Sequence, residues 1–314
     1  MEIKKYEIFI NVIYFCGSPR EPGNVEQQTA DISIVVANYN NGRYLDTLIG
    51  SVLGSTLLPR ELIIVDDGST DQSAEILEAY AGNPMLRTIR FTENRGFAHA
   101  LNAGISAASG RYIGRVDPDD ILLPQRLEWQ YRYMEEHPEV DVLGGNVMYF
   151  HGETGRDIFP SNFRPHHHDI LSAYRQGDHG IQHPTVLVKA PVYKQYQYFQ
   201  EHFPAEDYDV FARMIRDGYR FANLPQPLNR MRIHAGSVSA GLCFLTIRKT
   251  FLLRDQIFGL HSTSWQQKRY YYHILLYRRF LFARNYCTKI LCIALSAMIY
   301  PRKVMLRLKD RFRA

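Results

Sequence analysis

The sequence contains few cysteines and no long hydrophobic run. Its four cysteines form no CxxC pair and have no histidines at the spacing of zinc ligands: Cys16, Cys243, Cys287 and Cys292. They indicate neither a disulfide framework nor a structural zinc site, and they fit a reducing cytoplasm. No apolar stretch approaches the roughly 20 residues that a membrane-spanning helix needs, and the longest, at 290–300, is about half as long.

A clear targeting signal is also absent from the N-terminal segment. A basic pair and an apolar stretch at 4–16 imitate a short signal peptide, but acidic and amide residues interrupt them and no cleavage site follows. An added N-terminal strand is the alternative. Residues 17–31 are rich in Gly, Pro and polar side chains and predict a linker. We therefore expect residues 1–30 to be an N-terminal extension and the folded domain to begin near Asp31.

Charge is distributed unevenly along a chain whose composition is otherwise that of a globular protein. The 314 residues are 46% hydrophobic, which permits a sizeable core and excludes a disordered or fibrous protein. The formal net charge is +5, but residues 248–314 hold 15 Lys or Arg against two acidic residues. The balance is therefore +13 in this C-terminal segment and −8 in the remainder. An acidic body with a basic tail is typical of a protein that meets phosphate or an anionic surface.

Short apolar runs rich in β-branched residues alternate with helical patterns from residue 32 onward. They predict strands at 32–37, 62–65, 85–91 and 111–116 and helices at 44–53, 71–80 and 96–108. Further strands are predicted at 142–149 and 185–188, a helix at 206–217, and helices alone from about residue 242. Repeated strand–helix units predict an α/β domain over 31–241, with a mostly parallel sheet and helices on both faces, followed by a helical basic region over 242–314.

Polar clusters follow three of the predicted strands. They are Asn-Tyr-Asn at 38–40, Asp-Asp-Gly at 66–68 and Asp-Pro-Asp-Asp at 117–120. Ligands of open parallel sheets bind at the carboxyl ends of the strands, so we expect the three clusters to share one rim of the sheet.

The acidic run at 117–120 has the residue types of a divalent cation site. Asp117 and Asp119 stand two residues apart after a strand, and together with phosphate oxygens they can hold one hard cation such as Mg²⁺ or Mn²⁺. The alternative is a helix N-terminal cap, which is plausible for Asp120 ahead of Leu122.

A second acidic pair, Glu206 and Asp207, begins the predicted helix at 206–217. A carboxylate here can act as a general base that removes a proton from an attacking hydroxyl group. The alternative is a carboxylate that stabilises the helix N-terminus through the helix dipole, and both interpretations can hold together.

These motifs in this order resemble family 2 of the glycosyltransferases, whose members have the GT-A fold. The resemblance covers about residues 32–240 and includes Ile-Ser-Ile-Val-Val-Ala-Asn-Tyr-Asn at 32–40, Val-Asp-Asp-Gly-Ser-Thr-Asp at 65–71, Asn-Arg-Gly at 94–96 and Asp-Pro-Asp-Asp at 117–120. One departure is Ala37, where many members have proline before the nucleotide loop. This change loosens a turn but removes no chemical group.

The resemblance implies a metal-dependent, inverting transfer of sugar from a nucleotide-diphosphate sugar, with a UDP-sugar as the expected donor. Tyr39 and Asp67 would hold the base and ribose, and Asp117 would lie against the ribose. Asp119 would ligate the metal ion, Mn²⁺ or Mg²⁺. Asp207 would be the base.

Further candidates carry weaker signals. Arg95 either neutralises the diphosphate or is a solvated turn residue before a helix. His183 and Glu206 lie in segments that resemble acceptor-side and supporting motifs of the family. His234 can complete metal coordination or contact the diphosphate, and Arg232 can add positive charge nearby.

The basic C-terminal segment, 248–314, interleaves arginines with aromatic and aliphatic residues. This pattern suits a helix that lies on an anionic membrane surface, which would bring the enzyme to a lipid-linked acceptor. Packing against the catalytic domain accounts for the aromatic residues equally well. No recognised nucleic-acid motif accompanies the charge, so nucleic acid is not an expected partner.

The sequence therefore predicts a cytoplasmic or peripheral glycosyltransferase that acts on a saccharide or lipid-linked acceptor in cell-surface polysaccharide synthesis. A nucleotidyltransferase that makes the sugar nucleotide is one alternative, but the first strand lacks a glycine-rich basic triphosphate loop. A non-catalytic protein that binds sugar nucleotides or membranes is the other, since fold alone does not establish activity.

Overall fold

The computed structural model describes residues 28–234, 243–283, 285–301, 303–305 and 308. Most of the expected N-terminal extension and the end of the predicted catalytic domain, residues 235–241, lie outside the described residues. The proposed domain division near residue 242 stays a prediction.

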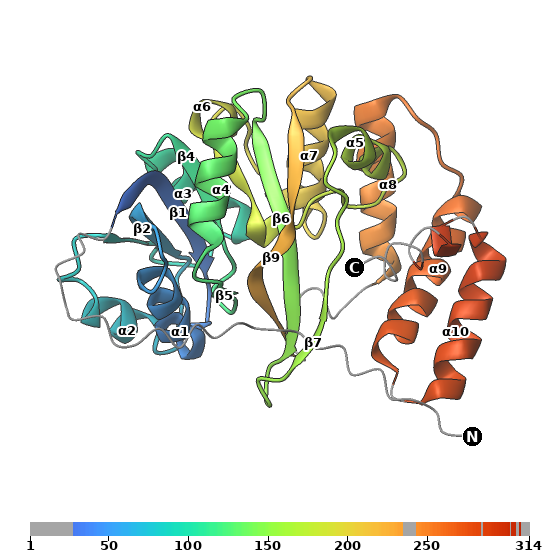
Figure 1. The fold of residues 1–314 in the computed structure, drawn as a ribbon, viewed down its shortest axis with the longest axis horizontal. Helices are drawn as coiled ribbons and strands as arrows, with labels where there is room; N and C mark the ends of the chain where they lie inside the picture. Colours follow the sequence, from blue (N-terminus) through green and yellow to red (C-terminus); the bar gives the residue numbers. More distant parts are fainter. Residues whose placement is uncertain (1–27, 235–242, 284, 302, 306–307, 309–314) are drawn as a thin grey trace.

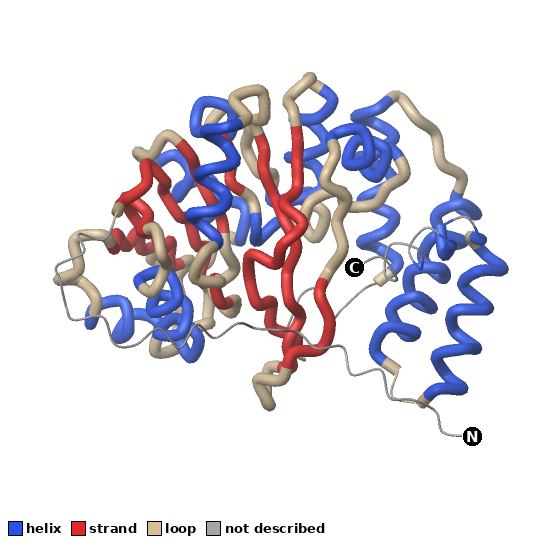
Figure 2. The backbone as a smooth tube through the Cα atoms, viewed as in Figure 1, coloured by secondary structure: helices blue, strands red, loops and turns tan. Residues whose placement is uncertain are grey.

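The described residues form a nine-stranded sheet (Figures 1 and 2). Its strands are β1 (Thr29–Asn38), β2 (Leu58–Asp66), β3 (Leu86–Arg90), β4 (Tyr112–Arg115), β5 (Ile121–Leu122), β6 (Val142–His151), β7 (Asp157–Pro160), β8 (Leu187–Lys189) and β9 (Phe221–Ile233). They are ordered β3-β2-β1-β4-β8-β6-β9-β5, and β7 pairs with β6. The pairs β3-β2, β2-β1, β1-β4 and β6-β9 are parallel, whereas β8, β5 and β7 run antiparallel to their neighbours. The mostly parallel α/β sheet is therefore confirmed.

The structure describes ten α-helices, of which only those from α1 to α8 contribute to the cores on the two faces of the sheet. They are α1 (Gly42–Leu53), α2 (Ser73–Ala79), α3 (Phe97–Ala107), α4 (Arg126–Glu136), α5 (His167–Arg175), α6 (Ala190–Tyr193), α7 (Glu206–Arg216), α8 (Phe244–Phe258), α9 (Ser264–Phe282) and α10 (Tyr286–Ile299), with short 3₁₀ turns η1 (His183–Thr185) and η2 (Gln200–His202). One hydrophobic core packs α1, α2 and α4 on one face, and another packs α3, α5, α6, α7 and part of α8 on the other. In β1, Ile34 and Val36 belong to the first core and Val35 and Ala37 to the second, because successive strand side chains point to opposite faces.

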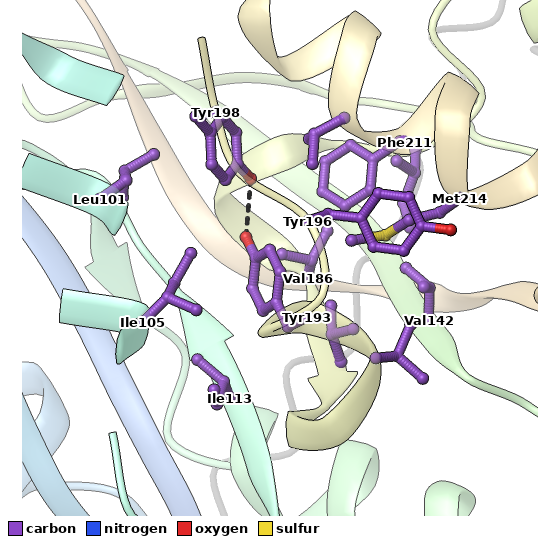
Figure 3. Close-up of a cluster of buried hydrophobic side chains, with 14 of the residues drawn as sticks. Leu101, Ile105, Ile113, Val142, Val186, Tyr193, Tyr196, Tyr198, Phe211 and Met214 are labelled. Atoms are coloured by element: carbon purple, nitrogen blue, oxygen red, sulfur yellow. Dashed lines mark hydrogen bonds between the residues drawn. The ribbon is translucent and has the colours of Figure 1, made fainter. Parts of the chain in front are cut away.

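The second core contains buried tyrosines as well as aliphatic side chains. Figure 3 shows Leu101 of α3 and Phe211 of α7 on either side of Tyr193 and Tyr198. The two tyrosine hydroxyl oxygens lie 2.7 Å apart and share a hydrogen bond. The hydroxyl groups of Tyr193 and Tyr198 therefore each have a hydrogen-bond partner, as buried polar groups require.

The polypeptide after β4 differs from one expectation of the sequence analysis. Asp120 does not cap a helix, because Ile121–Leu122 forms the short strand β5 and α4 begins only at Arg126. The Asp120 carboxylate is buried instead, and its Oδ1 accepts a hydrogen bond of 3.2 Å from the backbone N–H of Arg232 on β9. The helix-cap interpretation of Asp120 is therefore wrong.

A buried arginine at the start of α4 connects β4, which precedes this acidic run, to β9. The Arg126 side chain is fully buried and donates to the carbonyl oxygen of Arg115 at 2.9 Å and to Asn229 Oδ1 at 2.7 Å. These bonds join the end of β4 to β9, which are distant in sequence. The acidic run is therefore held by the sheet from both sides.

The C-terminal region is helical, as predicted. Leu253 and Ile257 of α8 belong to the second core, whereas α9 and α10 lie side by side at the edge of the molecule (Figure 1). Asp178, in the loop after α5, accepts hydrogen bonds from the Tyr270 hydroxyl group and from Lys303 and so fastens this region to the catalytic domain. None of the described helices is both long and apolar enough to cross a membrane.

Candidate active site

The loops after β1 and β2 are tied together by side-chain hydrogen bonds. The backbone N–H of Asn40 donates to Ser69 Oγ at 2.9 Å, and the Asn40 side chain accepts from the Thr70 N–H at 2.8 Å. Asn40 adopts a left-handed conformation with φ of 53°, which asparagine tolerates better than most residues. This turn leaves the neighbouring Tyr39 side chain 45% exposed at the rim, as a residue that contacts a nucleotide base must be.

Asp67 holds a third loop on the same rim. Its two buried carboxylate oxygens accept hydrogen bonds from the backbone N–H groups of Arg95 and Gly96, at 2.7 and 2.9 Å. Gly68 beside it has φ of +69°, and a Cβ there would lie 2.5 Å from the backbone of Glu93. The Asp-Asp-Gly motif therefore fixes how the loop before α3 meets the rim. Asp66 is fully buried and accepts from the Asn38 side chain at 3.1 Å.

Asp117, the first residue of the acidic run, forms an ion pair with Arg115 at the end of β4. Arg115 is itself buried, and its guanidinium carbon lies 5.2 Å from the centre of the Phe97 ring. Burial raises the pKa of Asp117, and the charges of Asp119 and Asp207 add to this effect, while Arg115 opposes it. Burial is therefore the main reason why the neutral form of Asp117 is favoured, although Arg115 lies beside it.

Asp119 lies against the two late-segment candidates, His234 and Arg232. Its Oδ2 is 2.9 Å from Nε2 of His234, and its backbone carbonyl accepts from Nε of Arg232 at 2.9 Å. The Arg232 guanidinium is also stacked 4.6 Å from the centre of the Tyr44 ring on α1. Residues 119, 232 and 234 thus meet although more than a hundred positions separate them. The rest of the late motif, residues 235–239, lies outside the described residues.

The Asp119–His234 pair fits a divalent cation that is shared with a ligand. His234 Nε2 and Asp119 Oδ2 lie 2.9 Å apart, and an imidazole nitrogen and a carboxylate oxygen are both donor types that Mn²⁺ would accept. Among the described residues, no group of three or more His, Cys, Asp or Glu side chains is arranged to hold a metal ion alone. A bound diphosphate would therefore have to complete the coordination.

Glu206 and Asp207 begin α7, as predicted, and differ in exposure. The Glu206 side chain is buried, and burial together with the charge of Asp207 raises the pKa of Glu206 to about 7. The Asp207 side chain remains 25% exposed, and its Oδ2 lies 3.7 Å from Nδ1 of His179. Of the two carboxylates, only Asp207 is therefore open to a substrate.

The raised pKa of Glu206 predicts a stability that falls with pH. The native state binds this proton more tightly than the unfolded state, so stability from the group is present below pH 4.5 and is lost as pH rises through about 7. Glu206→Gln should increase the free energy of unfolding at pH 8 by up to about 3 kcal/mol, with no gain near pH 4.5. Urea denaturation at both pH values measures this difference.

The matched control is Glu201→Gln, which changes an exposed glutamate in η2 nearby. It should leave the free energy of unfolding unchanged at both pH values. Equal effects of the two variants at pH 8 would contradict the assignment of a buried proton to Glu206.

Other sequence candidates lie less directly at the rim. The Ala37 side chain packs in the second core and leaves only backbone atoms to approach a nucleotide. Arg95 is exposed, with its guanidinium carbon 4.9 Å from the centre of the Phe91 ring, which is compatible with both of its predicted roles.

His183 is buried rather than open to an acceptor. Its Nε2 lies 2.8 Å from the hydroxyl oxygen of Tyr198, and burial together with Arg115 lowers its pKa well below the ordinary value. The His183 ring contacts Tyr198 and Phe211 of the second core. Its acceptor-side role stays a prediction.

Two residues at the site were missed by the sequence analysis. Arg115 could have been found, because it stands two residues before Asp117 at the end of a predicted strand and side chains two apart share a face. His179 carries no such signal, since the loop after α5 brings it to Asp207 from a separate part of the chain.

The family model described as "Glycosyl transferase family 2" matches residues 33–216. The chain belongs to glycosyl transferase family 2. It is 27% identical over 290 residues to the uncharacterized glycosyltransferase MJ1057 of Methanocaldococcus jannaschii. This match covers 89% of this chain and 94% of that protein. It is 30% identical over 210 residues to the amylovoran biosynthesis glycosyltransferase AmsE of Erwinia amylovora, which covers 65% of this chain and 76% of that protein.

Solved structures establish the same fold. TarS of S. aureus (residues 1–349, in complex with UDP-GlcNAc) superposes with a TM-score of 0.59 at 20% identity, over 87% of this chain and 82% of that chain. The mannosyltransferase PcManGT of Pyrobaculum calidifontis, in complex with GDP-Man and Mn²⁺, gives a TM-score of 0.54 at 15% identity, over 93% and 84% of the two chains. This member of the family is a glycosyltransferase with the GT-A fold, so both alternatives of the sequence analysis are set aside.

Proposed function

We propose that this family 2 enzyme transfers a sugar, with inversion, from a nucleotide-diphosphate donor to a saccharide or lipid-linked acceptor. The observation that carries the proposal is a pair of acidic positions: Asp117 follows β4 next to Asp119, which lies 2.9 Å from His234, and Asp207 begins α7 with its side chain 25% exposed. One belongs to the rim that would receive a donor, and the other is the exposed carboxylate that would receive an acceptor. Donor and acceptor chemistry would thus share one site.

On the donor side, Tyr39 and the loop held by Asp67 would contact the base and ribose, with Asp117 against the ribose. Mn²⁺ or Mg²⁺, held by Asp119, His234 and the diphosphate, would neutralise the leaving group's growing negative charge. Arg232, whose Nε donates to the carbonyl oxygen of Asp119, would add positive charge close by. A UDP-sugar is our preferred donor, in line with the UDP-GlcNAc complex of TarS.

On the acceptor side, Asp207 would accept the proton of the attacking hydroxyl group as its oxygen bonds to the anomeric carbon. The bond from that carbon to the diphosphate oxygen breaks in the same step, so the configuration inverts. A cavity of about 530 Å³ lies between the α5 region and the C-terminal helices, and Asp207 is not among its lining residues. His179 lines this cavity and also contacts Asp207.

We place the reaction in the cytoplasm, where nucleotide sugars are made, and in cell-surface polysaccharide synthesis. The biosynthetic role in the name of AmsE supports the second point. A peripheral position at the membrane would suit a lipid-linked acceptor.

The experiment is a nucleotide-release assay with UDP-glucose, UDP-galactose, UDP-GlcNAc and GDP-mannose, each with Mn²⁺ and with EDTA. We expect release from at least one UDP-sugar that is at least tenfold faster with Mn²⁺ than with EDTA. Equal release with EDTA would contradict metal dependence. Release from GDP-mannose alone would contradict the preferred base, and neither release nor binding of any donor would overturn the proposal.

A further inference from the structure

The apolar side of α10 faces outward. Its exposed positions are Cys287, Ile290, Leu291, Ala294, Leu295 and Met298. At 3.6 residues per turn these positions cover one continuous arc of roughly 140° on the helix. Ile290 is 51%, Leu291 59% and Met298 77% exposed. A helix that packs on a protein core normally buries such a stripe, so folding of the described residues leaves the stripe of α10 unused.

The side of α10 that packs inward is small and partly polar. Cys292 and Ser296 are its buried residues, and Ser296 Oγ lies 2.8 Å from Nδ1 of the buried His273 on α9. The helix is therefore held to α9 through its less apolar side. Its orientation is fixed by these contacts, since a rotation that buried Leu291 would expose Ser296 and remove the bond to His273.

The surrounding sequence is strongly basic. Between Asp255 and Asp310 there is no Asp or Glu, and the basic residues are Lys268, Arg269, Arg278, Arg279, Arg284, Lys289, Arg302, Lys303, Arg307 and Lys309. Lys268 and Arg279 of α9 are exposed. An apolar stripe within a strongly basic segment matches the two attractions of an interfacial helix, namely apolar insertion and attraction to anionic headgroups.

We propose that α10 docks this stripe on the surface of an anionic lipid membrane, with the helix axis in the plane of the interface. The charge argues for lipid over a second copy of the chain, because pairing two such regions would bring like charges together. Figure 1 shows α10 at the outer edge of the molecule, where a flat surface can approach it. The inference depends on neither the proposed donor nor the proposed base.

Flotation with lipid vesicles tests the proposal. The full chain is mixed with vesicles of phosphatidylcholine alone or with about one third phosphatidylglycerol. We expect the partition coefficient onto the anionic vesicles to exceed that onto neutral vesicles by about tenfold or more, and to fall as salt is raised. The double variant Leu291→Gln/Met298→Gln should lose at least about tenfold of the binding to anionic vesicles, because two inserted side chains are removed.

The matched control is Leu252→Gln on α8, a leucine that is 53% exposed outside the stripe. It should bind anionic vesicles within about twofold of wild type, and all variants should keep the wild-type nucleotide release and melting temperature. Absence of wild-type binding to anionic vesicles would overturn the proposal, as would equal binding by the double variant. Sedimentation that showed a dimer, dissociated by the double variant, would assign the stripe to a second copy and overturn it too.

Discussion

Asp119→Ala should lower kcat/KM for sugar transfer by at least about 10²–10³-fold, comparable to removing one electrostatic stabiliser of a transition state. Asp119 is the carboxylate that lies 2.9 Å from His234, and it would be the protein's anionic ligand to the metal ion beside the diphosphate. The loss should appear in both nucleotide release and transfer, because both break the same bond to the leaving group. Initial rates across a range of Mn²⁺ concentrations measure it, and the variant should also need more metal for half-maximal rate.

The matched control is Asp31→Ala, which removes a partly exposed carboxylate near the other end of β1. Asp31 pairs with Arg60 at 3.0 Å, and an exposed pair of this kind contributes little to stability. Asp31→Ala should keep kcat/KM within about twofold of wild type. A wild-type rate for Asp119→Ala, in a protein with the wild-type melting temperature, would contradict the metal-ligand assignment.

The sequence predicted the first half of the fold because its signals there are local. The run at 62–65 is apolar and β-branched, and it became the buried centre of β2 (Leu58–Asp66), followed at once by the acidic pair. In a parallel sheet this placement suffices to bring the polar loops to one rim. The rule that ligands bind at the carboxyl ends of strands therefore predicted the candidate donor side of the site without any knowledge of side-chain contacts.

Contacts between distant segments were beyond the sequence. The sequence near Asp120 does not predict that its carboxylate accepts a hydrogen bond from the backbone N–H of Arg232 on β9, 112 positions later. Without that partner, a helix cap was a reasonable local interpretation of the same carboxylate. Arg126 gives a similar case, since an arginine in a helical pattern normally lies on the surface. Its burial is tolerable because distant groups, such as the carbonyl of Arg115 and the amide of Asn229, accept its hydrogen bonds.

The composition of the C-terminal region predicted basic, partly apolar helices but not which of their side chains face outward. The pattern of α10 fits a helix packed on a core as well as one placed on a membrane. The contact between His273 and Ser296 lies on the inward side of α10, so the apolar side faces outward, and this orientation supports our membrane proposal. The membrane interpretation of the basic tail thereby acquires a specific surface, which the composition of 248–314 could not supply.

Asp207→Asn should lower kcat for transfer by about 10²–10⁴-fold, the usual contribution of a general base. The amide keeps the shape of the side chain and can still accept the hydrogen bond from the Tyr208 N–H, so α7 should remain intact. Donor binding, measured by calorimetry with a non-reacting donor analogue, should change by less than about threefold, because Asp207 acts on the acceptor. A reduced kcat with nearly unchanged donor affinity is the expected signature.

Asp217→Asn, at the other end of the same helix, is the control, since Asp217 is partly exposed and pairs with Arg216 at 2.7 Å. The comparison that decides the base is with Glu206→Gln. Glu206 has the pKa of about 7 that suits a general base, but its carboxylate is buried, whereas the Asp207 side chain is 25% exposed. If Glu206→Gln abolishes transfer and Asp207→Asn does not, Glu206 is the base, and the exposure of the side chain does not identify the general base here. If Asp207→Asn alone abolishes it, the raised pKa of Glu206 reflects burial beside Asp207 and has no part in proton transfer.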